Sequence, residues 1–307
     1  MTEQTETQAV PMPPKHSGFC AIIGAPNAGK STLVNQITGS KVSIVSHKVQ
    51  TTRARIRAIA MEGNTQIVLV DTPGIFKPKR LLDRTMVNNA WGGAGDADAV
   101  VYLVDGRPGV TDEAREIMAQ LGATKTKAML VINKIDLMPR EKLMETAAAF
   151  NEVYPFEKTF MVSALNGSGT ADLRKAIAER MPPGPWLYPE DQVADVQLRF
   201  MAAEMTREKI YERLHEELPY SSTVETEGWE ERKDGSVKID QVIYVQRDSQ
   251  KAIVLGKGGQ TVKLINQLAR ADMEKYFERK VHLFLFVKVR ENWTEDKERL
   301  RMMGLDV

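Results

Sequence analysis

Short apolar runs and helical patterns alternate along the first part of the chain. Six runs rich in Val, Ile and Leu predict strands at residues 19–24, 54–60, 66–71, 99–105, 127–133 and 158–164. Helical spacing of apolar residues separates them, at residues 30–38, 83–94, 111–121, 140–150 and 169–180. Nearly continuous apolar strands are typical of burial on both faces, and strands that alternate with helices favour a mainly parallel sheet. The first predicted domain, residues 17–181, is therefore of the α/β class.

A proline-rich segment ends this pattern. The stretch MPPGPWLYPEDQ, residues 181–192, holds four prolines. Prolines at this density predict a linker, which we place at 182–193. A smaller α+β domain is expected beyond it, over residues 194–307.

The predicted second domain begins with an amphipathic helix over residues 194–217. Its apolar face carries Val196, Phe200, Ala203 and Ile210, and its Glu, Arg and Lys residues lie elsewhere. The elements that follow are strand, strand, helix, helix and strand, at residues 222–232, 236–246, 249–255, 260–276 and 280–289. A turn at Asp234 and Gly235 joins the two consecutive strands.

Composition adds a few limits. The chain of 307 residues has a net charge of +1, which by itself indicates no class of partner. Its single cysteine, Cys20, lies in an apolar run and permits no intramolecular disulfide, which suits a reducing, cytoplasmic compartment. No apolar run approaches the ~18 residues of a membrane-spanning helix. Residues 1–16 are polar and then proline-rich, without the apolar stretch of a secretory signal, and predict a disordered tail.

The stretch GAPNAGKS, residues 24–31, fits the pattern G-x-x-x-x-G-K-[ST] between a predicted strand and a predicted helix. Its glycines allow backbone N–H groups to surround phosphate oxygens, and the positive end of the following helix adds to the attraction. Lys30 is expected to reach the β- and γ-phosphates, and the Ser31 hydroxyl to bind Mg²⁺. The predicted phosphate contacts are Gly24, Asn27, Ala28, Gly29, Lys30, Ser31 and Thr32.

The tetrapeptide NKID, residues 133–136, identifies the base. It ends a predicted buried strand about a hundred residues after the phosphate loop. The Asp136 carboxylate can accept both the ring N1–H and the exocyclic amine of guanine, whereas adenine has no such pair of donors. Asn133 can brace the loop, and the Lys134 stem can lie against the ring. A P-loop ATPase or kinase is therefore disfavoured.

Two more segments end predicted strands. In DTPG, residues 71–74, Asp71 is expected to hold Mg²⁺ through water, and the Gly74 N–H to sense a γ-phosphate. In SAL, Ser163, Ala164 and Leu165, the backbone N–H groups are expected to meet the guanine O6. Four elements in this order, each at a strand end, predict a protein that binds GTP, GDP and Mg²⁺.

The motifs resemble those of translation-factor-class GTPases. The resemblance implies a magnesium-ligating threonine in the segment QTTR, residues 50–53; we expect Thr52, and Thr51 is the alternative. Ras-like enzymes place a water-orienting glutamine where this chain has Ile75, so slow intrinsic hydrolysis is expected. Some relatives hold a potassium ion with an asparagine of the phosphate loop, which makes Asn27 a candidate for a catalytic K⁺ site together with Lys30 and Thr52.

A second glycine loop, Gly256-Lys257-Gly258-Gly259, lies between two predicted helices. Its surroundings have the element order of a type II KH domain, in which such a G-x-x-G loop clamps the backbone of about four nucleotides. Residues 247–290 hold ten Lys and Arg against four acids, a local charge of +6, whereas residues 194–307 hold 20 bases and 21 acids. The positive charge is therefore local, as expected for an RNA contact face. The candidates beside the loop are Lys251, Lys257 and Lys263.

A GTPase domain, a KH domain with AIVLGKGGQTVKLI and a tail with ENWTEDKERLRMMG together resemble the Era family of bacterial GTPases, over residues 18–307. The resemblance implies binding to 16S rRNA near its 3′ end and a role in maturation of the 30S subunit. By analogy the strand at 242–246 and Trp293 contact bases, although packing of Trp293 against a helix is an equal alternative.

Location and an alternative function complete these expectations. We expect a cytoplasmic monomer. Family members are also described at the membrane surface, and peripheral association with the inner membrane stays open. The alternative function is a signalling or membrane-associated GTPase whose KH domain makes protein contacts.

Overall fold

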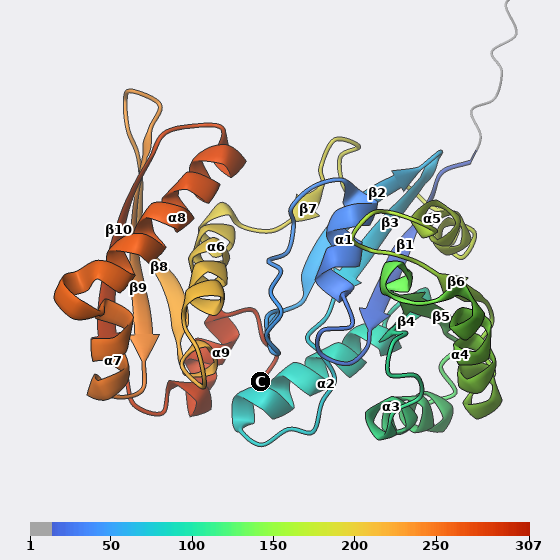
Figure 1. Cartoon of the computed structure of the whole chain (residues 1–307). Coiled ribbons are helices and arrows are strands. Elements are labelled where there is room, and N and C mark those ends of the chain that lie inside the picture. Colours follow the sequence, from blue (N-terminus) through green and yellow to red (C-terminus); the bar gives the residue numbers. More distant parts are fainter. Residues whose placement is uncertain (1–13) are drawn as a thin grey trace, which may run out of the picture.

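The computed structural model describes residues 14–307, in two domains that contact each other side by side (Figure 1). The first domain holds a seven-stranded sheet in the order β6-β5-β4-β1-β3-β2-β7. Its strands are β1 His16–Ile23, β2 Ile56–Glu62, β3 Thr65–Asp71, β4 Ala99–Asp105, β5 Met129–Asn133, β6 Thr159–Met161 and β7 Ala194–Asp195. Strands β3, β1, β4, β5 and β6 are parallel, and β2 and β7 add an antiparallel edge. The mainly parallel α/β sheet predicted from the sequence is confirmed.

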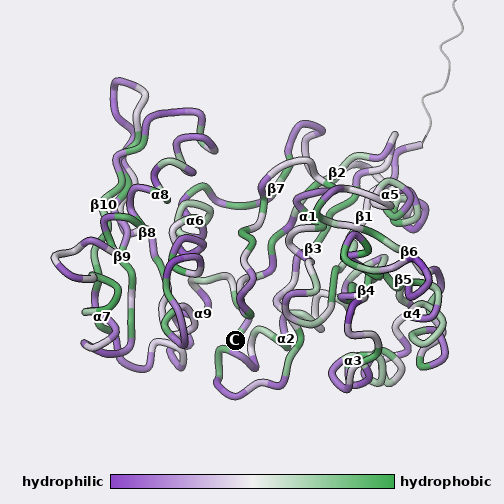
Figure 2. The backbone as a smooth tube through the Cα atoms, in the orientation of Figure 1, coloured by the Kyte–Doolittle hydropathy of each residue, from purple (hydrophilic) through white to green (hydrophobic). Residues whose placement is uncertain are grey.

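Helices cover both faces of this sheet. The five helices are α1 Lys30–Thr38, α2 Leu81–Gly95, α3 Asp112–Ala123, α4 Arg140–Val153 and α5 Thr170–Ala178. Successive residues of β1 face opposite sides, so Cys20 and Ile22 join the core beneath α1 and α5, whereas Ala21 and Ile23 join the core beneath α2, α3 and α4. Figure 2 shows the apolar strands in the interior of the domain. Cys20 is fully buried there, which raises the pKa of its thiol to about 12.

The second domain is an α+β unit with a three-stranded sheet in the order β10-β9-β8. Strand β9 is central, parallel to β10 and antiparallel to β8. Its elements are α6 Leu198–Arg213, β8 Thr223–Glu231, β9 Val237–Val245, α7 Asp248–Leu255, α8 Gln260–Phe277, β10 Val281–Val289 and α9 Lys297–Met302. The predicted order of a type II KH domain is confirmed.

The segment between the domains is packed along the first domain. Leu187 N and Tyr188 N donate to Gln66 Oε1 at 2.8 and 3.0 Å, and β7 then pairs with β2. The helix predicted over 194–217 is therefore shorter and starts at Leu198, because residues 194–195 hydrogen-bond to the sheet of the first domain. That sheet extends past the boundary we placed at residue 193.

The structure bears on the predictions for the two ends of the chain. Of the tail predicted over residues 1–16, residues 1–13 lie outside the described residues and His16 begins β1. At the other end, Trp293, Leu300 and Leu305 are buried against Leu82 and Met86 of α2. The C-terminus consequently lies between the two domains (Figure 1). No helix within residues 14–307 is long and apolar enough to cross a membrane.

Candidate functional site

The phosphate loop joins β1 to α1 at the carboxyl edge of the sheet, where β3, β4, β5 and β6 also end. Two of its glycines cannot be replaced without strain. Gly24 has a φ of 154°, and a Cβ there would lie 2.2 Å from the carbonyl oxygen of Leu103; Gly29 has a φ of 101°, and its Cβ would lie 2.3 Å from Asn133 Nδ2. No side chain caps the N-terminus of α1. Its first N–H groups therefore remain to bind an anion held in the loop.

Lys30 places a buried cation inside this loop. Its ammonium group donates to the carbonyl oxygens of Gly24 and Ala25 at 3.0 and 2.9 Å. Burial lowers the pKa of Lys30 to about 8, and the negative charge of Asp71 opposes part of that shift. A cation in such a desolvated position would interact strongly with phosphate oxygens, and the contact of Lys30 with the phosphates stays a prediction.

The three predicted magnesium ligands lie together. Ser31 Oγ donates to Asp71 Oδ2 at 2.7 Å and lies 2.7 Å from Thr52 Oγ1, which is itself 3.5 Å from Asp71 Oδ2. Asp71 Oδ1 is buried and has no hydrogen-bond partner among the described residues. Such an orphaned carboxylate oxygen, beside two hydroxyls, fits a hydrated Mg²⁺ ion, which prefers oxygen ligands. Burial also raises the pKa of the Asp71 carboxyl, and a bound cation would lower it again.

The geometry distinguishes the two candidate threonines. Thr51 Oγ1 lies 2.6 Å from Ser46 Oγ and donates to Lys48 O at 2.7 Å. Its hydroxyl therefore serves the loop itself, whereas the Thr52 hydroxyl belongs to the Ser31 and Asp71 group. We call residues 41–53, which include both, the switch loop.

The predicted base-binding segments are braced against the phosphate loop. Asn133 Nδ2 donates to Ala28 O at 2.8 Å, and Asn133 Oδ1 accepts from Ala164 N at 2.9 Å. The bracing role predicted for Asn133 is thus present. Because Ala164 N already has this partner, its contact with guanine O6 stays a prediction.

Lys134 makes contacts that the sequence did not predict. Its ammonium donates to Asn27 O at 2.7 Å and to Asp105 Oδ2 at 2.9 Å. Burial raises the pKa of Asp105, but hydrogen bonds from Arg107 and Lys134 outweigh it and lower the pKa to about 2. Asp105 therefore holds the Lys134 ammonium, a contact that the motifs missed. Its place at the end of β4, on the same edge as the other motifs, is the signal that was available.

The remaining predicted contacts line the same edge. Asp136 is exposed on the short helical turn Ile135–Leu137, Ser163 is buried, and Leu165 is 77% exposed. A Cβ at Gly74 would lie 2.9 Å from Pro26 Cγ, so DTPG and the phosphate loop are in close contact. The residues that line the cleft at this edge include Asn27, Gly29, Lys30, Ser31, Thr32, Thr52 and Gly74.

Ile75 lies where the water-orienting glutamine would stand. Its side chain is buried in the core beneath α2 and α3, and its N–H donates to Gly24 O at 3.0 Å. It therefore offers no polar group to a water molecule, as expected from the sequence.

The second glycine loop connects α7 to α8. Gly256, Gly258 and Gly259 have φ values of 72°, 60° and 78°, a region that favours glycine. A Cβ at Gly258 or Gly259 would meet nothing within 4 Å. The loop thus projects bare backbone into open space, which is what a close approach by a phosphate chain needs.

Cations and apolar side chains surround this loop. Lys257 and Lys263 are exposed and Lys251 is half-buried. None of the three joins an ion pair within residues 14–307, although other bases of the +6 stretch, Arg279 among them, are paired. Ile253 is 54% exposed on α7 beside them. Free positive charge and exposed apolar surface therefore coincide at the loop.

Two predicted RNA contacts are wrong for this conformation. Trp293 is fully buried and its Nε1–H donates to Ser221 O at 3.0 Å, so the packing alternative holds and the ring is not available for stacking on a base. Strand β9 is central, and Val242, Ile243 and Val245 of the segment predicted to contact bases are at most 1% exposed, so these three side chains are not available to bases.

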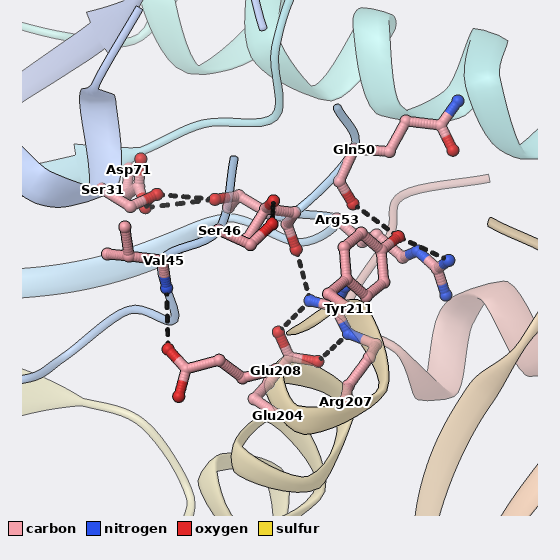
Figure 3. Close-up of polar contacts among 12 residues, drawn as sticks. Ser31, Val45, Ser46, Gln50, Arg53, Asp71, Glu204, Arg207, Glu208 and Tyr211 are labelled. Carbon is pink, nitrogen blue, oxygen red and sulfur yellow. Dashed lines mark hydrogen bonds and ion pairs between the residues drawn. The ribbon is translucent and has the colours of Figure 1, made fainter. Parts of the chain in front are cut away.

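The structure also brings the second domain to the switch loop. Glu204, Arg207, Glu208 and Tyr211 of α6 face it (Figure 3). These residues carry no motif. Because their contacts join segments more than 150 residues apart, no local pattern marks them.

Comparisons with known proteins agree with this description. A family described as 50S ribosome-binding GTPase matches residues 19–134, and a KH domain family matches residues 217–294. GTPase Era of Brucella suis biovar 1 (strain 1330) is 60% identical over 305 residues, which cover 99% of this chain and 96% of the relative. GTPase Era of Afipia carboxidovorans (strain ATCC 49405 / DSM 1227 / KCTC 32145 / OM5) is 61% identical over 293 residues, 95% of each chain.

Solved structures give the same answer. A crystal structure of Era in complex with MgGDPNP and nucleotides 1506–1542 of 16S ribosomal RNA has a TM-score of 0.90 and 35% identity, and covers 94% of this chain and 99% of that chain. A variant of Aquifex aeolicus Era bound to GDP and AlF4⁻ matches with the same TM-score and identity. The resemblance inferred from the sequence is confirmed, and the chain belongs to the Era family of GTPases.

Proposed function

We propose that this GTPase binds the 3′ end of 16S rRNA through its KH domain and assists maturation of the 30S subunit. The observation that carries the proposal is the bare Gly256–Gly259 loop with three lysines, Lys251, Lys257 and Lys263, that have no ion-pair partner in the described part of the chain. Further support comes from the Era complex with nucleotides 1506–1542 of 16S ribosomal RNA, which matches 94% of this chain.

The first domain binds GTP and hydrolyses it. The phosphate loop and the N-terminus of α1 bind the phosphates, with Lys30 as the buried cation. Ser31, Thr52 and Asp71 would hold Mg²⁺, which neutralises charge on the β- and γ-phosphates when bound. Asp136 would accept the two guanine N–H groups. Since Ile75 cannot polarise the attacking water, slow intrinsic turnover is expected.

A potassium ion is our candidate for a positive charge that assists hydrolysis in place of the water-orienting glutamine. Asn27 has a φ of 60° and lines the phosphate cleft, and its side chain makes no hydrogen bond with the described residues. It is therefore free to hold a cation beside the β- and γ-phosphates. Turnover should be faster in potassium than in sodium buffer, and Asn27→Ala should remove the difference. Equal turnover of the wild type in both salts would exclude the ion.

RNA binding is tested by Gly258→Asp, which puts an anion into the open loop. Affinity for a transcript of the 16S 3′ end should fall at least tenfold, since the carboxylate repels the phosphate chain that the loop is built to approach. Gly63→Asp is the matched control, because Gly63 also has a positive φ, 55°, and open space around it, but lies in the first domain. GTP affinity should be unchanged in both variants. RNA affinity unaffected by Gly258→Asp would refute the KH loop as the site.

The alternative function, a signalling or membrane-associated GTPase whose KH domain makes protein contacts, is not favoured. Clustered unpaired lysines at a bare glycine loop fit a polyanion better than a protein surface. We propose that the protein acts as a cytoplasmic monomer; no described residue argues for peripheral membrane association. Light scattering of the purified chain should give the mass of one copy. The mass of two copies would contradict the proposed monomer.

A further inference from the structure

The switch loop is bound along α6 of the KH domain (Figure 3). Glu208 is 4% exposed, and its carboxylate accepts from Val45 N at 2.9 Å and pairs with Lys41 Nζ at 2.5 Å. Lys48 Nζ donates to Leu214 O at 2.7 Å, at the C-terminal end of α6, where a cation is favourable. Three residues of the first half of the loop, Lys41, Val45 and Lys48, therefore bind the second domain.

The second half of the loop is held next to Thr52. Tyr211 OH donates to Gln50 O at 3.1 Å. Gln50 has a φ of 57°, an uncommon conformation for a residue other than glycine, and such a conformation persists only when its surroundings hold it. The hydrogen bond from Tyr211 stabilises this conformation of Gln50. A second hydrogen bond, from Gln50 Nε2 to Asp83 Oδ1 at 3.1 Å, does the same.

Arg207 holds the next carbonyl. Its Nη2 donates to Thr51 O, and its Nε donates to Glu204 Oε1 at 2.7 Å. Glu204 also accepts from Nη2, so the carboxylate fixes the plane of the guanidinium. Arg207 is 1% exposed, and its orientation toward the Thr51 carbonyl is therefore set within a buried interface.

On the far side of Thr52, Arg53 points into the second domain. Its guanidinium donates to Ser222 O at 2.9 Å and to Tyr211 OH at 3.1 Å. Residues 50, 51 and 53 are consequently all bound to the KH domain. Thr52, between them, turns its hydroxyl the other way, to within 2.7 Å of Ser31 Oγ in the magnesium group.

We propose that Arg207 and Tyr211 are positioning residues for Thr52, so that the KH domain helps to build the Mg²⁺-GTP site of the other domain. Switch segments of GTPases are ordered by contacts to Mg²⁺ and the γ-phosphate. Contacts that hold Thr52 in place therefore favour GTP over GDP. Because binding couplings are reciprocal, GTP in turn strengthens the hold of the switch loop on α6.

The test uses the full chain and two independent changes. Tyr211→Phe removes only the hydroxyl. Arg207→Gln combined with Glu204→Gln removes the buried pair without leaving an unpaired charge. Arg199→Gln is the matched control, since Arg199 lies on the same helix but donates to Glu227 O within the KH domain.

Two readouts separate positioning from a general structural role. The first is the affinity for a fluorescent, non-hydrolysable GTP analogue with Mg²⁺ relative to that for GDP. It should fall about threefold in Tyr211→Phe and about tenfold in the Arg207 and Glu204 variant, in line with the loss of a neutral and of a charged hydrogen bond. The second is amide hydrogen exchange of residues 45–53 with the analogue bound, which should be faster in both. Arg199→Gln should match the wild type.

The proposal is overturned by an unchanged ratio of analogue to GDP affinity in Tyr211→Phe, which keeps the ring. An equal loss of affinity for both nucleotides gives that same unchanged ratio and would show that the contacts only stabilise the fold.

Discussion

Replacing Trp293 with leucine tests whether the tail is part of the domain interface or part of the RNA site. The indole is fully buried among Leu82, Met86 and Leu300. Truncating a buried tryptophan to alanine costs about 3–5 kcal/mol, and leucine keeps part of the packing. The lost bond leaves Ser221 O, which accepts at 3.0 Å, without its donor, at a further cost of about 1 kcal/mol. We therefore expect the free energy of unfolding to fall by about 3 kcal/mol in all.

Urea unfolding followed by circular dichroism measures that loss, and fluorescence anisotropy measures binding to the 16S 3′ transcript. Affinity at a temperature where the variant is folded should stay within about threefold of the wild type, whereas an aromatic ring stacked on a base contributes about 1–3 kcal/mol. Unchanged stability together with a tenfold or greater loss of RNA affinity would refute the role of Trp293 in the domain interface. It would indicate instead that Trp293 contacts RNA.

Three further predictions concern the nucleotide site. Gly24→Ala would put its Cβ 2.2 Å from Leu103 O and should lower GDP affinity more than tenfold, by fluorescence titration; normal affinity would disprove the tight packing. Asp136→Asn should weaken GTP and favour xanthosine triphosphate in competition binding, and retained GTP affinity would remove Asp136 from the base site. Asp105→Asn should weaken nucleotide binding by loosening Lys134. Because the pKa of Asp105 is lowered to about 2, the stability it provides is present above about pH 4 and is lost as the pH falls toward 2. The difference in stability between wild type and Asp105→Asn should shrink over that range, and a constant difference would contradict the pairing.

The sequence predicted the first domain well because its signals are local. Phosphate and base motifs follow strands whose carboxyl ends must meet at one edge of a parallel sheet. The position of Lys30, Asp71 and Asn133 relative to one another thus follows once the strands are identified. Asp105 was missed because a carboxylate after a strand has many roles, and only its partner Lys134 reveals this one.

In the second domain, the local sequence pattern did not reveal the contacts with the first domain. The apolar face of α6 was identified, and its charged residues were placed elsewhere on the helix. In the structure Glu204, Arg207 and Glu208 are each at most 9% exposed, since that side of the helix meets the switch loop. Amphipathicity reports one buried face, and a helix between two domains has two. The tail has the same limit, because its apolar residues Trp293, Leu300 and Leu305 pack on a surface of the other domain.

Two of the contacts between the domains differ in chemistry, and the difference bears on how they respond to nucleotide. The tail contact packs Trp293, Leu300 and Leu305 against α2 and also includes the bond from Asn89 Nδ2 to Asp306 O at 3.2 Å, and its apolar side chains would be exposed to water if the domains separated. The contact of α6 with the switch loop is built from buried charges, and Arg207 Nη1 and Arg53 Nε have no hydrogen-bond partner among the described residues. Buried charges that are not fully paired gain hydration when an interface opens, so such an interface separates at lower cost than an apolar one. If loss of the γ-phosphate releases Thr52, we expect the polar contact to open before the contact between the tail and α2.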